Sequence, residues 1–258
     1  MSSPKYKRVL LKISGEAFCR ASGRGLDVKE IESIAEEILN AAKLKTQIAV
    51  VVGGGNIVRG QELAGSGVSQ ATGDYMGMLA TVINALSLQD VLERHGAQTR
   101  VMTALAIQSV AEPFIRRRAL RHLEKGRIVI LGAGTGNPHF TTDTAAALRA
   151  TELGAEILMK ASKVDGVYTS DPKRDLSAKK YESLSYQDVL AQRLRVMDAT
   201  AISMCMEYSL PIVVFDLFRK GNIVRAIEGK PIGTRIGETE PLKKAKTVRR
   251  ETSRGGTR

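Results

Sequence analysis

Residues that commonly carry metal, redox and covalent chemistry are scarce in this sequence. Its 258 residues include no tryptophan, 5 phenylalanines, 6 tyrosines, 2 cysteines and 3 histidines. The two cysteines, Cys19 and Cys205, and the histidines fall in no metal-ligand spacing, and no Cys/His or Ser/His pair is evident. We therefore predict no metal held by protein ligands alone, no covalent nucleophile, and the reducing setting of the cytoplasm.

Long apolar runs are also absent. No stretch approaches the roughly 18 apolar residues of a membrane span, and residues 1–12 show no apolar core followed by a small-residue cleavage site. We expect neither a membrane segment nor a signal peptide. Hydrophobic residues make up 43% and charged residues 26% of the chain, which is typical of a globular protein with one large domain or two small ones.

Two common nucleotide-binding fingerprints are missing. The sequence contains neither GxGxxG nor GxxxxGK[ST], so a phosphate site would have to use another scaffold. Aromatic residues interleaved with basic ones, helix-turn-helix patterns and RNA-recognition signatures are missing too. These absences argue against a nucleic-acid-binding module, the main alternative that the basic composition raises.

The positive charge is unevenly distributed. The formal net charge is +12, and residues 243–258 carry seven Lys and Arg against Glu251, which is half of the excess. This segment is rich in Gly, Ser and Thr, so we predict that 243–258 is a disordered basic tail and that 1–242 is the folded part. The field of the folded part suits anionic small molecules as well as nucleic acid.

Short apolar runs alternate with amphipathic ones along the chain. Strands are predicted at 8–13, 47–52, 99–103, 127–131, 155–159 and 212–215, and helices at 28–43, 74–95, 112–125, 142–153, 186–195, 197–208 and 220–228. Because the strands are apolar on both faces, we predict an α/β fold: a three-layer αβα sandwich around a mostly parallel sheet. Residues 165–184, with turn residues and little periodicity, are predicted to form a hairpin-like excursion.

Glycine-rich segments follow several of the predicted strands. Gly15 comes after a strand that contains Lys12, and Gly53, Gly54 and Gly55 follow the next strand, with Arg59 close behind. Glycine lets the backbone come close to a ligand or to another strand, and its amides can surround phosphate oxygens. Lys12 could place a positive charge on a transferring phosphoryl group. Because such loops lie at the carboxyl ends of parallel strands, we expect them to share one crevice.

A third glycine-bearing segment runs from Gly132 to Asp143. Asn137-Pro138 forces a bend, Thr141 and Thr142 offer hydroxyls and amides where a helix begins, and Asp143 is in its first turn. A carboxylate there is either an ordinary favourable charge at a helix start or a group that holds Lys12 or a Mg²⁺-bound water in place.

Two further positions allow a structural and a functional interpretation. Tyr168, after Lys160 and Ser162, either faces a nucleotide base or covers the edge of the core. Asp74, at the predicted start of a helix, is either a cap or an acceptor for ribose hydroxyls. Together the segments describe a crevice for two phosphate-bearing substrates, in which positioning and charge accelerate phosphoryl transfer.

The motifs resemble those of the bacterial-type UMP kinases, a branch of the amino acid kinase superfamily, over residues 5 to about 240. The residues that carry this resemblance are Lys12-Ile13-Ser14-Gly15, Gly53-Gly54-Gly55-Asn56 with Arg59, Gly73-Asp74-Tyr75-Met76-Gly77-Met78, Thr135-Gly136-Asn137-Pro138-His139-Phe140-Thr141-Thr142-Asp143 and Lys160-Ala161-Ser162-Lys163-Val164-Asp165-Gly166-Val167-Tyr168. The Gly-Asp-x-Met-Gly-Met segment that begins at Gly73 and the Thr-Gly-Asn-Pro-x-Phe-Thr-Thr-Asp segment that begins at Thr135 are the most specific to the UMP-using branch.

The resemblance implies an enzyme that transfers the γ-phosphoryl group of ATP to UMP, with Mg²⁺, in pyrimidine nucleotide biosynthesis. It implies ATP contacts from Lys12, Ile13, Ser14, Gly15, Gly55, Arg59, Ser162, Tyr168 and Asp171. It implies UMP contacts from Gly54, Asp74, Thr135, Gly136, Asn137, Pro138, His139, Phe140, Thr141 and Thr142. Lys12, Arg59 and Asp143 would be the catalytic residues, and no residue would be a dedicated metal ligand.

The resemblance also implies assembly and regulation. The family is typically a homohexamer that is inhibited by UTP and often activated by GTP. Asp198 would be a regulatory or interface residue, unless it is an ordinary helix cap. The tail 243–258 has no counterpart in the family pattern, and any nucleic-acid binding is expected through it alone.

Overall fold

One large sheet organises the part of the chain that the computed structural model describes, residues 4–19, 24–59, 67–172, 174–175, 177–194 and 196–238. The predicted basic tail lies outside these residues. The strands of the sheet are β1 (Arg8–Ile13), β2 (Gln47–Val52), β3 (Thr99–Thr103), β4 (Glu112–Pro113), β5 (Ile128–Gly132), β6 (Ile157–Ser162), β7 (Ser183–Ser185), β8 (Ile212–Asp216) and β9 (Thr234–Gly237). Their order is β4-β3-β5-β2-β1-β6-β8-β9-β7, and every neighbouring pair is parallel except β8 with β9. The mostly parallel sheet is therefore confirmed.

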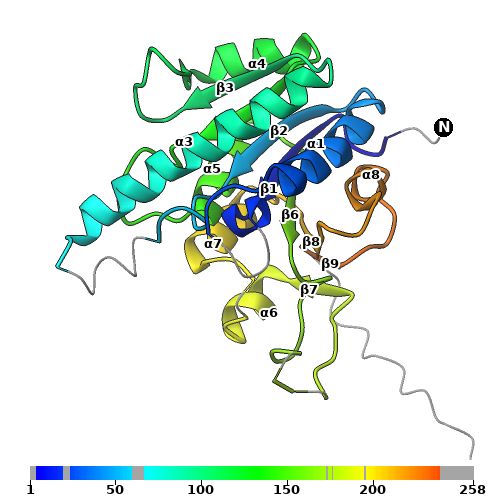
Figure 1. The fold of residues 1–258 in the computed structure, drawn as a ribbon. Helices are drawn as coiled ribbons and strands as arrows, with labels where there is room; N and C mark the ends of the chain where they lie inside the picture. The colour runs from blue at the N-terminus through cyan, green and yellow to red at the C-terminus, as the bar shows by residue number, and fades with distance from the viewer. Residues whose placement is uncertain are drawn as a thin grey trace, which may run out of the picture.

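Helices cover both faces of the sheet and form the three predicted layers (Figure 1). One face packs against α1 (Val28–Ala42), α3 (Gln70–Arg94) and α8 (Asn222–Ile227), beside the short 3-10 helix η1 (Gly15–Phe18). The other face packs against α4 (Arg116–Glu124), α5 (Thr142–Leu153), α6 (Tyr186–Ala191) and α7 (Ala199–Glu207).

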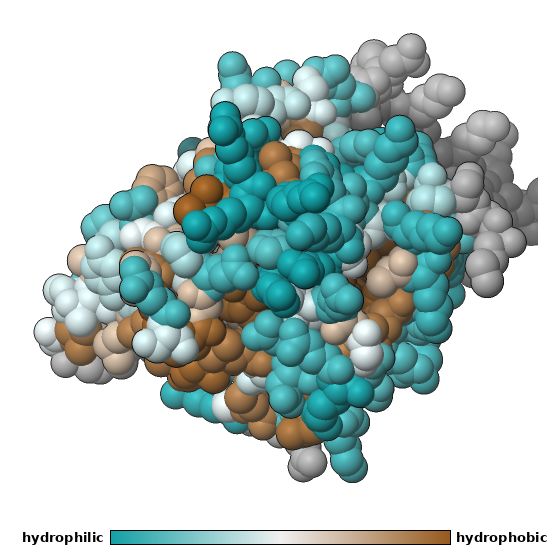
Figure 2. Space-filling model, turned by 90° about the horizontal axis from the view of Figure 1, so that it is seen from above, coloured by the Kyte–Doolittle hydropathy of each residue, from teal (hydrophilic) through white to brown (hydrophobic). Residues whose placement is uncertain are grey.

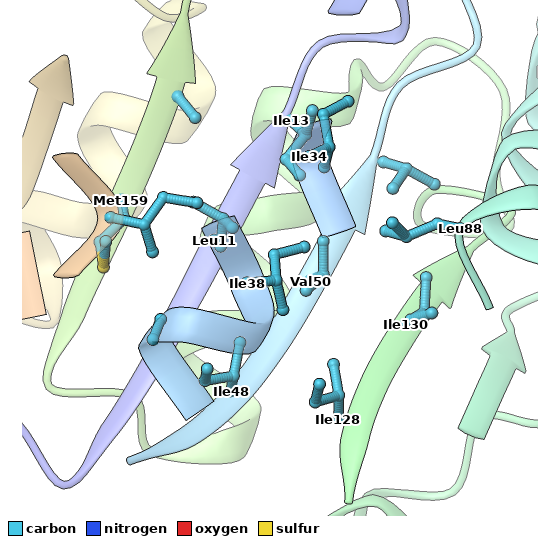
Figure 3. Packing of buried hydrophobic residues seen from close by; sticks show 14 of the residues in the cluster. Leu11, Ile13, Ile34, Ile38, Ile48, Val50, Leu88, Ile128, Ile130 and Met159 are labelled. Atoms are coloured by element: carbon cyan, nitrogen blue, oxygen red, sulfur yellow. The ribbon is translucent and has the colours of Figure 1, made fainter. Parts of the chain in front are cut away.

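Alternation along the strands divides the apolar side chains between two cores. Leu11 and Ile13 of β1 point toward α1 and contact the cluster that contains Ile38 (Figure 3), whereas Leu10 points to the opposite core beneath α5. All four side chains are 0% exposed. Strands buried on both faces need apolar residues at nearly every position, which is why these runs could be recognised in the sequence.

Helix α3 is long and apolar enough to cross a membrane by length and composition alone. Half of its most apolar stretch is buried inside the protein, where Leu88 and Leu92 join the core. Its other side exposes Tyr75, Leu79 and Ile83, with 43%, 48% and 45% of their surfaces accessible. Seen from above, hydrophobic side chains gather in a patch on an otherwise largely hydrophilic surface (Figure 2).

Several predicted boundaries were wrong. Helix α3 begins at Gln70, with Ser69 accepting a bond from the amide of Thr72, so Asp74 is inside the helix and does not cap it. Its first turn is polar and includes a glycine, which hid it from a search for apolar periodicity. Helix α4 begins at Arg116 because residues 112–113, predicted to be helical, pair with β3 as β4.

The remaining strands show smaller differences. Strand β5 begins and ends one residue later than predicted, β8 extends one residue further, and β6 runs from Ile157 through polar residues to Ser162. Strands β7 and β9 were not predicted because three or four partly polar residues carry no readable pattern. The hairpin-like excursion is confirmed by an antiparallel bridge between Tyr168 and Lys180.

Candidate active site

The centre of the sheet contains a topological switch point. From β1 the chain continues to β2 on one side, whereas β6 lies against the other side of β1. Connections leave the two strands in opposite directions, which opens a crevice at their carboxyl ends, where ligands bind in open α/β sheets. The segments after β1, β2, β5 and β6 all reach this edge.

A buried cluster of three charged residues occupies this position. Lys12 of β1 and Lys160 of β6 are register partners in adjacent parallel strands, and both contact the carboxylate of Asp143 in the first turn of α5. The Lys12 Nζ is 2.8 Å from Oδ1, and Lys160 donates to Oδ2 at 2.8 Å. Two cations on one carboxylate leave one positive charge in excess, at a place with little water to screen it.

Burial and charge act in opposite directions on these groups. Burial raises the pKa of Asp143, but the charges of Lys12 and Lys160 outweigh it, so the pKa lies below the ordinary value of 3.8 and the carboxylate stays ionised. For Lys160, burial lowers the pKa below 10.5 and the charge of Asp143 only partly restores it. Lys160 also donates to the Val196 carbonyl oxygen.

The glycine loops are built by close backbone approach. A Cβ on Gly15 would lie 2.6 Å from the Gly55 nitrogen, and one on Gly53 would lie 2.7 Å from the Gly15 nitrogen. A Cβ on Gly54 would meet the Gly77 carbonyl oxygen of α3 at 2.7 Å. These glycines are needed because the two loops and α3 touch each other. The Gly53 amide donates to the Ile13 carbonyl oxygen, so the predicted use of that amide for phosphate is wrong.

Two buried asparagine side chains, Asn56 and Asn84, connect the glycine loop after β2 to α3. Asn84, 0% exposed, donates to the Gly53 carbonyl oxygen at 2.6 Å and to Asn56 Oδ1 at 2.7 Å, and Asn56 donates to the Gly25 carbonyl oxygen at 2.7 Å. Each contact satisfies a polar group that would be costly to bury alone. No role was predicted for Asn84, because an asparagine inside an apolar helix pattern gives no sign of what it contacts.

Arg59 lies at the mouth of the site. Its guanidinium pairs with Glu16 of η1 and donates to the Gly55 carbonyl oxygen at 3.2 Å. Glu16 also lies 3.9 Å from Lys163. Arg59 is thus next to both glycine loops, as the prediction required, and its side chain is half exposed.

Two cavities flank the charged cluster. The first, which we call the α3 cavity, has a volume of about 210 Å³. Five of the residues predicted to bind UMP line it: Gly54, Asp74, Phe140, Thr141 and Thr142. The volume is below the roughly 300–1,000 Å³ typical of small-molecule sites, but the cavity is open to solvent, so its volume does not limit the size of a ligand.

The other residues predicted to bind UMP lie in the same loop but not in the lining of the α3 cavity. They are Thr135, Gly136, Asn137, Pro138 and His139. The Gly136 amide donates to the Ala133 carbonyl oxygen, and the His139 amide donates to Asp74 Oδ2 at 2.8 Å. Asp74 also accepts from Gln70 at 2.7 Å. Asp74 therefore joins α3 to this loop, and a ligand would have to share or replace these bonds.

The second space, which we call the hairpin cavity, has a volume of about 730 Å³. Its lining includes Lys160 and the three residues predicted to contact the ATP nucleoside: Ser162, Tyr168 and Asp171. The Tyr168 hydroxyl donates to Asp165 at 2.6 Å, which fixes the ring in the cavity wall. Gly55, predicted to contact ATP, lines the α3 cavity instead.

Asp198 connects α7 to the start of α5. It caps α7 by accepting from the Ala201 amide at 2.9 Å, so the interpretation as a helix cap is confirmed. It also accepts from the hydroxyls of Thr141 and of Thr144, the latter at 2.9 Å. The cap thereby orients Thr141, which lines the α3 cavity.

The residues of the cluster suit Mg²⁺ only when it is bound to phosphate. No group of three or more His, Cys, Asp or Glu side chains that could hold a metal occurs among the described residues. Each oxygen of Asp143 already lies 2.8 Å from a lysine ammonium group, but a carboxylate oxygen has a second lone pair, so Asp143 keeps acceptor capacity toward a cation or its water. Mg²⁺ commonly binds through one or two carboxylates together with substrate phosphates, and the cluster fits that arrangement.

The described residues thus form an open α/β sheet with a lysine–carboxylate cluster at its switch point and a cavity on either side of that cluster. The sequence matches the amino acid kinase family over residues 7–216, and the chain belongs to that family.

Solved structures of similar proteins narrow the comparison. The chain is 42% identical to the UMP kinase of Bacillus anthracis, with a TM-score of 0.89, over 91% of this chain and 97% of that one. It is 35% identical to the UMP kinase of Ureaplasma parvum, with a TM-score of 0.85, over 91% and 100%. It is 30% identical to the uridylate kinase of Archaeoglobus fulgidus, with a TM-score of 0.70, over 89% and 99%.

Proposed function

We propose that this enzyme transfers the γ-phosphoryl group of ATP to UMP, giving ADP and UDP, in pyrimidine nucleotide biosynthesis. The observation that carries the proposal is the Lys12–Asp143–Lys160 cluster, which lies at the switch point with the two cavities beside it. Three similar structures are those of UMP or uridylate kinases, which supports UMP as the acceptor.

ATP is assigned to the hairpin cavity. Ser162, Tyr168 and Asp171 face its nucleoside, and the phosphates extend toward the loops of Ser14, Gly15 and Gly55. The main chain of Ile13 leads into that turn. When ATP binds, the Arg59 guanidinium releases Glu16 and binds phosphate oxygens instead. Lys160 lines the same cavity, so its charge faces the end of the polyphosphate.

UMP is assigned to the α3 cavity and the loop beside it. Asp74 accepts hydrogen bonds from the ribose hydroxyls, while the amides and hydroxyls at the start of α5 hold the 5′-phosphate near the helix N-terminus. Thr135 to His139 form the outer wall around the base. Because Asp74 accepts from the His139 amide, UMP must share or replace that hydrogen bond.

Transfer requires little from the protein beyond placement and charge. A phosphate oxygen of UMP attacks the γ-phosphorus of ATP, the bond from that phosphorus to the β–γ bridging oxygen breaks, and ADP leaves with the bond electrons. The attacking oxygen is already anionic, so no general base is needed. Lys12 and Lys160 stabilise the charge spread over the transferring group, and Asp143 holds both ammonium groups in register. Asp143 would hold the Mg²⁺ that accompanies ATP, directly or through its water, and the ion would neutralise phosphate charge.

Assembly and regulation complete the proposal. The exposed apolar side of α3 is the surface on which we expect a second copy of the chain to pack, as part of a homohexamer. UTP shares its uridine and phosphates with the product UDP, so we expect it to inhibit the enzyme. We expect GTP to activate it. We place the enzyme in the cytoplasm, with residues 1–242 as one catalytic unit and 243–258 as an appendage that binds anions, nucleic acid included, only weakly.

A coupled assay of ADP release tests the reaction. Purified protein is supplied with Mg²⁺, ATP and one acceptor at a time: UMP, CMP, AMP, glutamate or carbamate. We expect turnover with UMP to exceed that with every other acceptor by at least tenfold. A preference for glutamate or carbamate would move the chain to another branch of the family.

A further inference from the structure

A third cavity lies away from the proposed substrate sites. We call it the α8 cavity; its volume is about 630 Å³, and it shares no lining residue with the α3 cavity or the hairpin cavity. Its walls come from α8 and the turn after it, from β8 and β9, and from the return segment of the hairpin at Lys180. The volume lies within the range of small-molecule sites.

The lining of the α8 cavity is strongly cationic. Five cationic side chains face it, against the two carboxylates of Asp165 and Glu182: Lys180, Arg219, Arg225, Lys230 and Arg235. Lys180 pairs with Asp165 at 3.0 Å, and Lys230 with Glu228 at 2.6 Å. Arg219 and Arg225 have neither an ion pair nor a side-chain hydrogen bond with any residue that the structure describes. Two arginines without carboxylate partners in one concave site favour a phosphate, which the guanidinium fork binds in bidentate fashion.

A buried amide supplies an independent indication of a ligand. Asn222, at the start of α8, lines the cavity and is only 5% exposed. Its Nδ2 donates to the Asp216 carbonyl oxygen at 2.9 Å, which fixes the orientation of the amide. Its Oδ1 is buried without a hydrogen-bond partner among the described residues. A buried acceptor is costly to leave unpaired, and a ligand hydroxyl, directly or through an ordered water, would satisfy it.

We propose that the α8 cavity is a second ligand site, which takes a small organic phosphate that also carries hydroxyl groups. The arginines bind the phosphate and Asn222 receives a hydroxyl. The binding site stands independently of the proposed reaction, because no residue of the Lys12–Asp143–Lys160 cluster lines it.

The hairpin connects this site to the hairpin cavity. Asp165 accepts from Lys180 on the α8 side and from Tyr168 on the other side, at 3.0 Å and 2.6 Å. A phosphate that attracts Lys180 weakens its bond to Asp165 and thus the anchor of the Tyr168 ring. Occupancy therefore changes the affinity for ATP, a consequence that rests on the proposed function.

Isothermal titration of the full-length protein with ribose 5-phosphate, without ATP or Mg²⁺, tests the site. We expect saturable binding to the unchanged protein, tighter than that of inorganic phosphate, and at least tenfold weaker binding to the R219Q/R225Q variant. R117Q/K125Q removes two positive charges on and beside α4, at the other edge of the sheet, and should bind normally, as should D74N, which alters the α3 cavity.

Three results would overturn the site: normal binding by R219Q/R225Q, an equal loss in R117Q/K125Q, or loss in D74N. The thermal midpoint of each variant identifies misfolding, and R225K, which keeps the charge but loses the bidentate fork, should bind more weakly than the unchanged protein and more tightly than R219Q/R225Q. For the coupling, ribose 5-phosphate should change the KM for ATP at least twofold in the unchanged enzyme but not in R219Q/R225Q. If ribose 5-phosphate binds normally but does not change the KM for ATP, the regulatory role is refuted. That result would not bear on the proposed UMP kinase activity, which the coupled assay tests separately.

Discussion

Asp143 shows how a single carboxylate controls the charge of the site. Replacing it by asparagine keeps the shape but leaves Lys12 and Lys160 facing each other without an anion. Breaking such a buried arrangement costs about 3–5 kcal/mol of stability, and losing the charge that orders the lysines should reduce turnover about 100- to 1,000-fold. Steady-state kinetics and urea unfolding of D143N measure both effects. D90N, which alters an exposed carboxylate at the end of α3, should match the unchanged protein; full activity in D143N would refute the assignment.

The same residue gives stability a dependence on pH. The pKa of Asp143 is lower in the folded protein than its ordinary value of 3.8, since the charges of the two lysines outweigh burial. Its contribution is therefore complete above about pH 4 and is lost as pH falls through the lower, folded-state value. We expect the difference in unfolding free energy between the unchanged protein and D143N to be constant from pH 7 to 5 and to shrink below pH 4. A difference that grows on acidification would contradict the ion pairs.

Gly54 illustrates a glycine needed for contact. A Cβ there would lie 2.7 Å from the Gly77 carbonyl oxygen and 2.9 Å from the Ala80 Cβ, so G54A must push the loop away from α3. We expect a loss of about 1–3 kcal/mol in unfolding free energy. G77A is the matched control, because a Cβ at Gly77 meets nothing within 4 Å and alanine favours the helix; it should stabilise by about 0.5–1 kcal/mol. Equal effects of the two variants would refute the packing argument.

At the scale of elements, the start of α5 depends on the start of α7. D198A removes the cap of α7 and frees the hydroxyls of Thr141 and Thr144. We expect a loss of about 0.5–2 kcal/mol and a rise of at least fivefold in the KM for UMP. S185A removes the cap of α6, no residue of which lines the α3 cavity, and should cost similar stability without changing that KM. A raised KM in both variants would show that general loosening is the cause.

At the scale of the molecule, the exposed side of α3 predicts association. Leu79 and Ile83 are four residues apart, so they lie on one side of the helix, next to Tyr75. Charges in an apolar contact between copies are strongly unfavourable, so L79E/I83E should dissociate the assembly, as light scattering after gel filtration would show. V28E changes a more exposed apolar residue on α1, 57% accessible, and should leave the assembly intact. If L79E/I83E keeps the mass of the unchanged protein, the contact lies elsewhere.

The amino-acid sequence alone was enough to predict the layers, most of the strands and the glycine loops. Apolar strands such as β1 and β2 and the periodic helix α1 are determined by local patterns, and a glycine run directly after a buried strand indicates close backbone approach. Ser162, Tyr168 and Asp171 line one cavity because they lie close together in the chain, at the last residue of β6 and in the segment directly after it.

Only the tertiary structure brought Lys160 to Lys12 and placed Asn84 beneath the glycine loop. Lys12 and Lys160 become neighbours through strand register across some 150 residues, and no local pattern records that register. The same holds for Asp74. The sequence allowed a helix cap or an acceptor for ribose hydroxyls, whereas in the structure its carboxylate accepts from the His139 amide. Local sequence patterns determine which helices and strands form. Which side chains contact each other depends on how elements distant in the sequence pack together, and the chemistry of the site depends on those contacts.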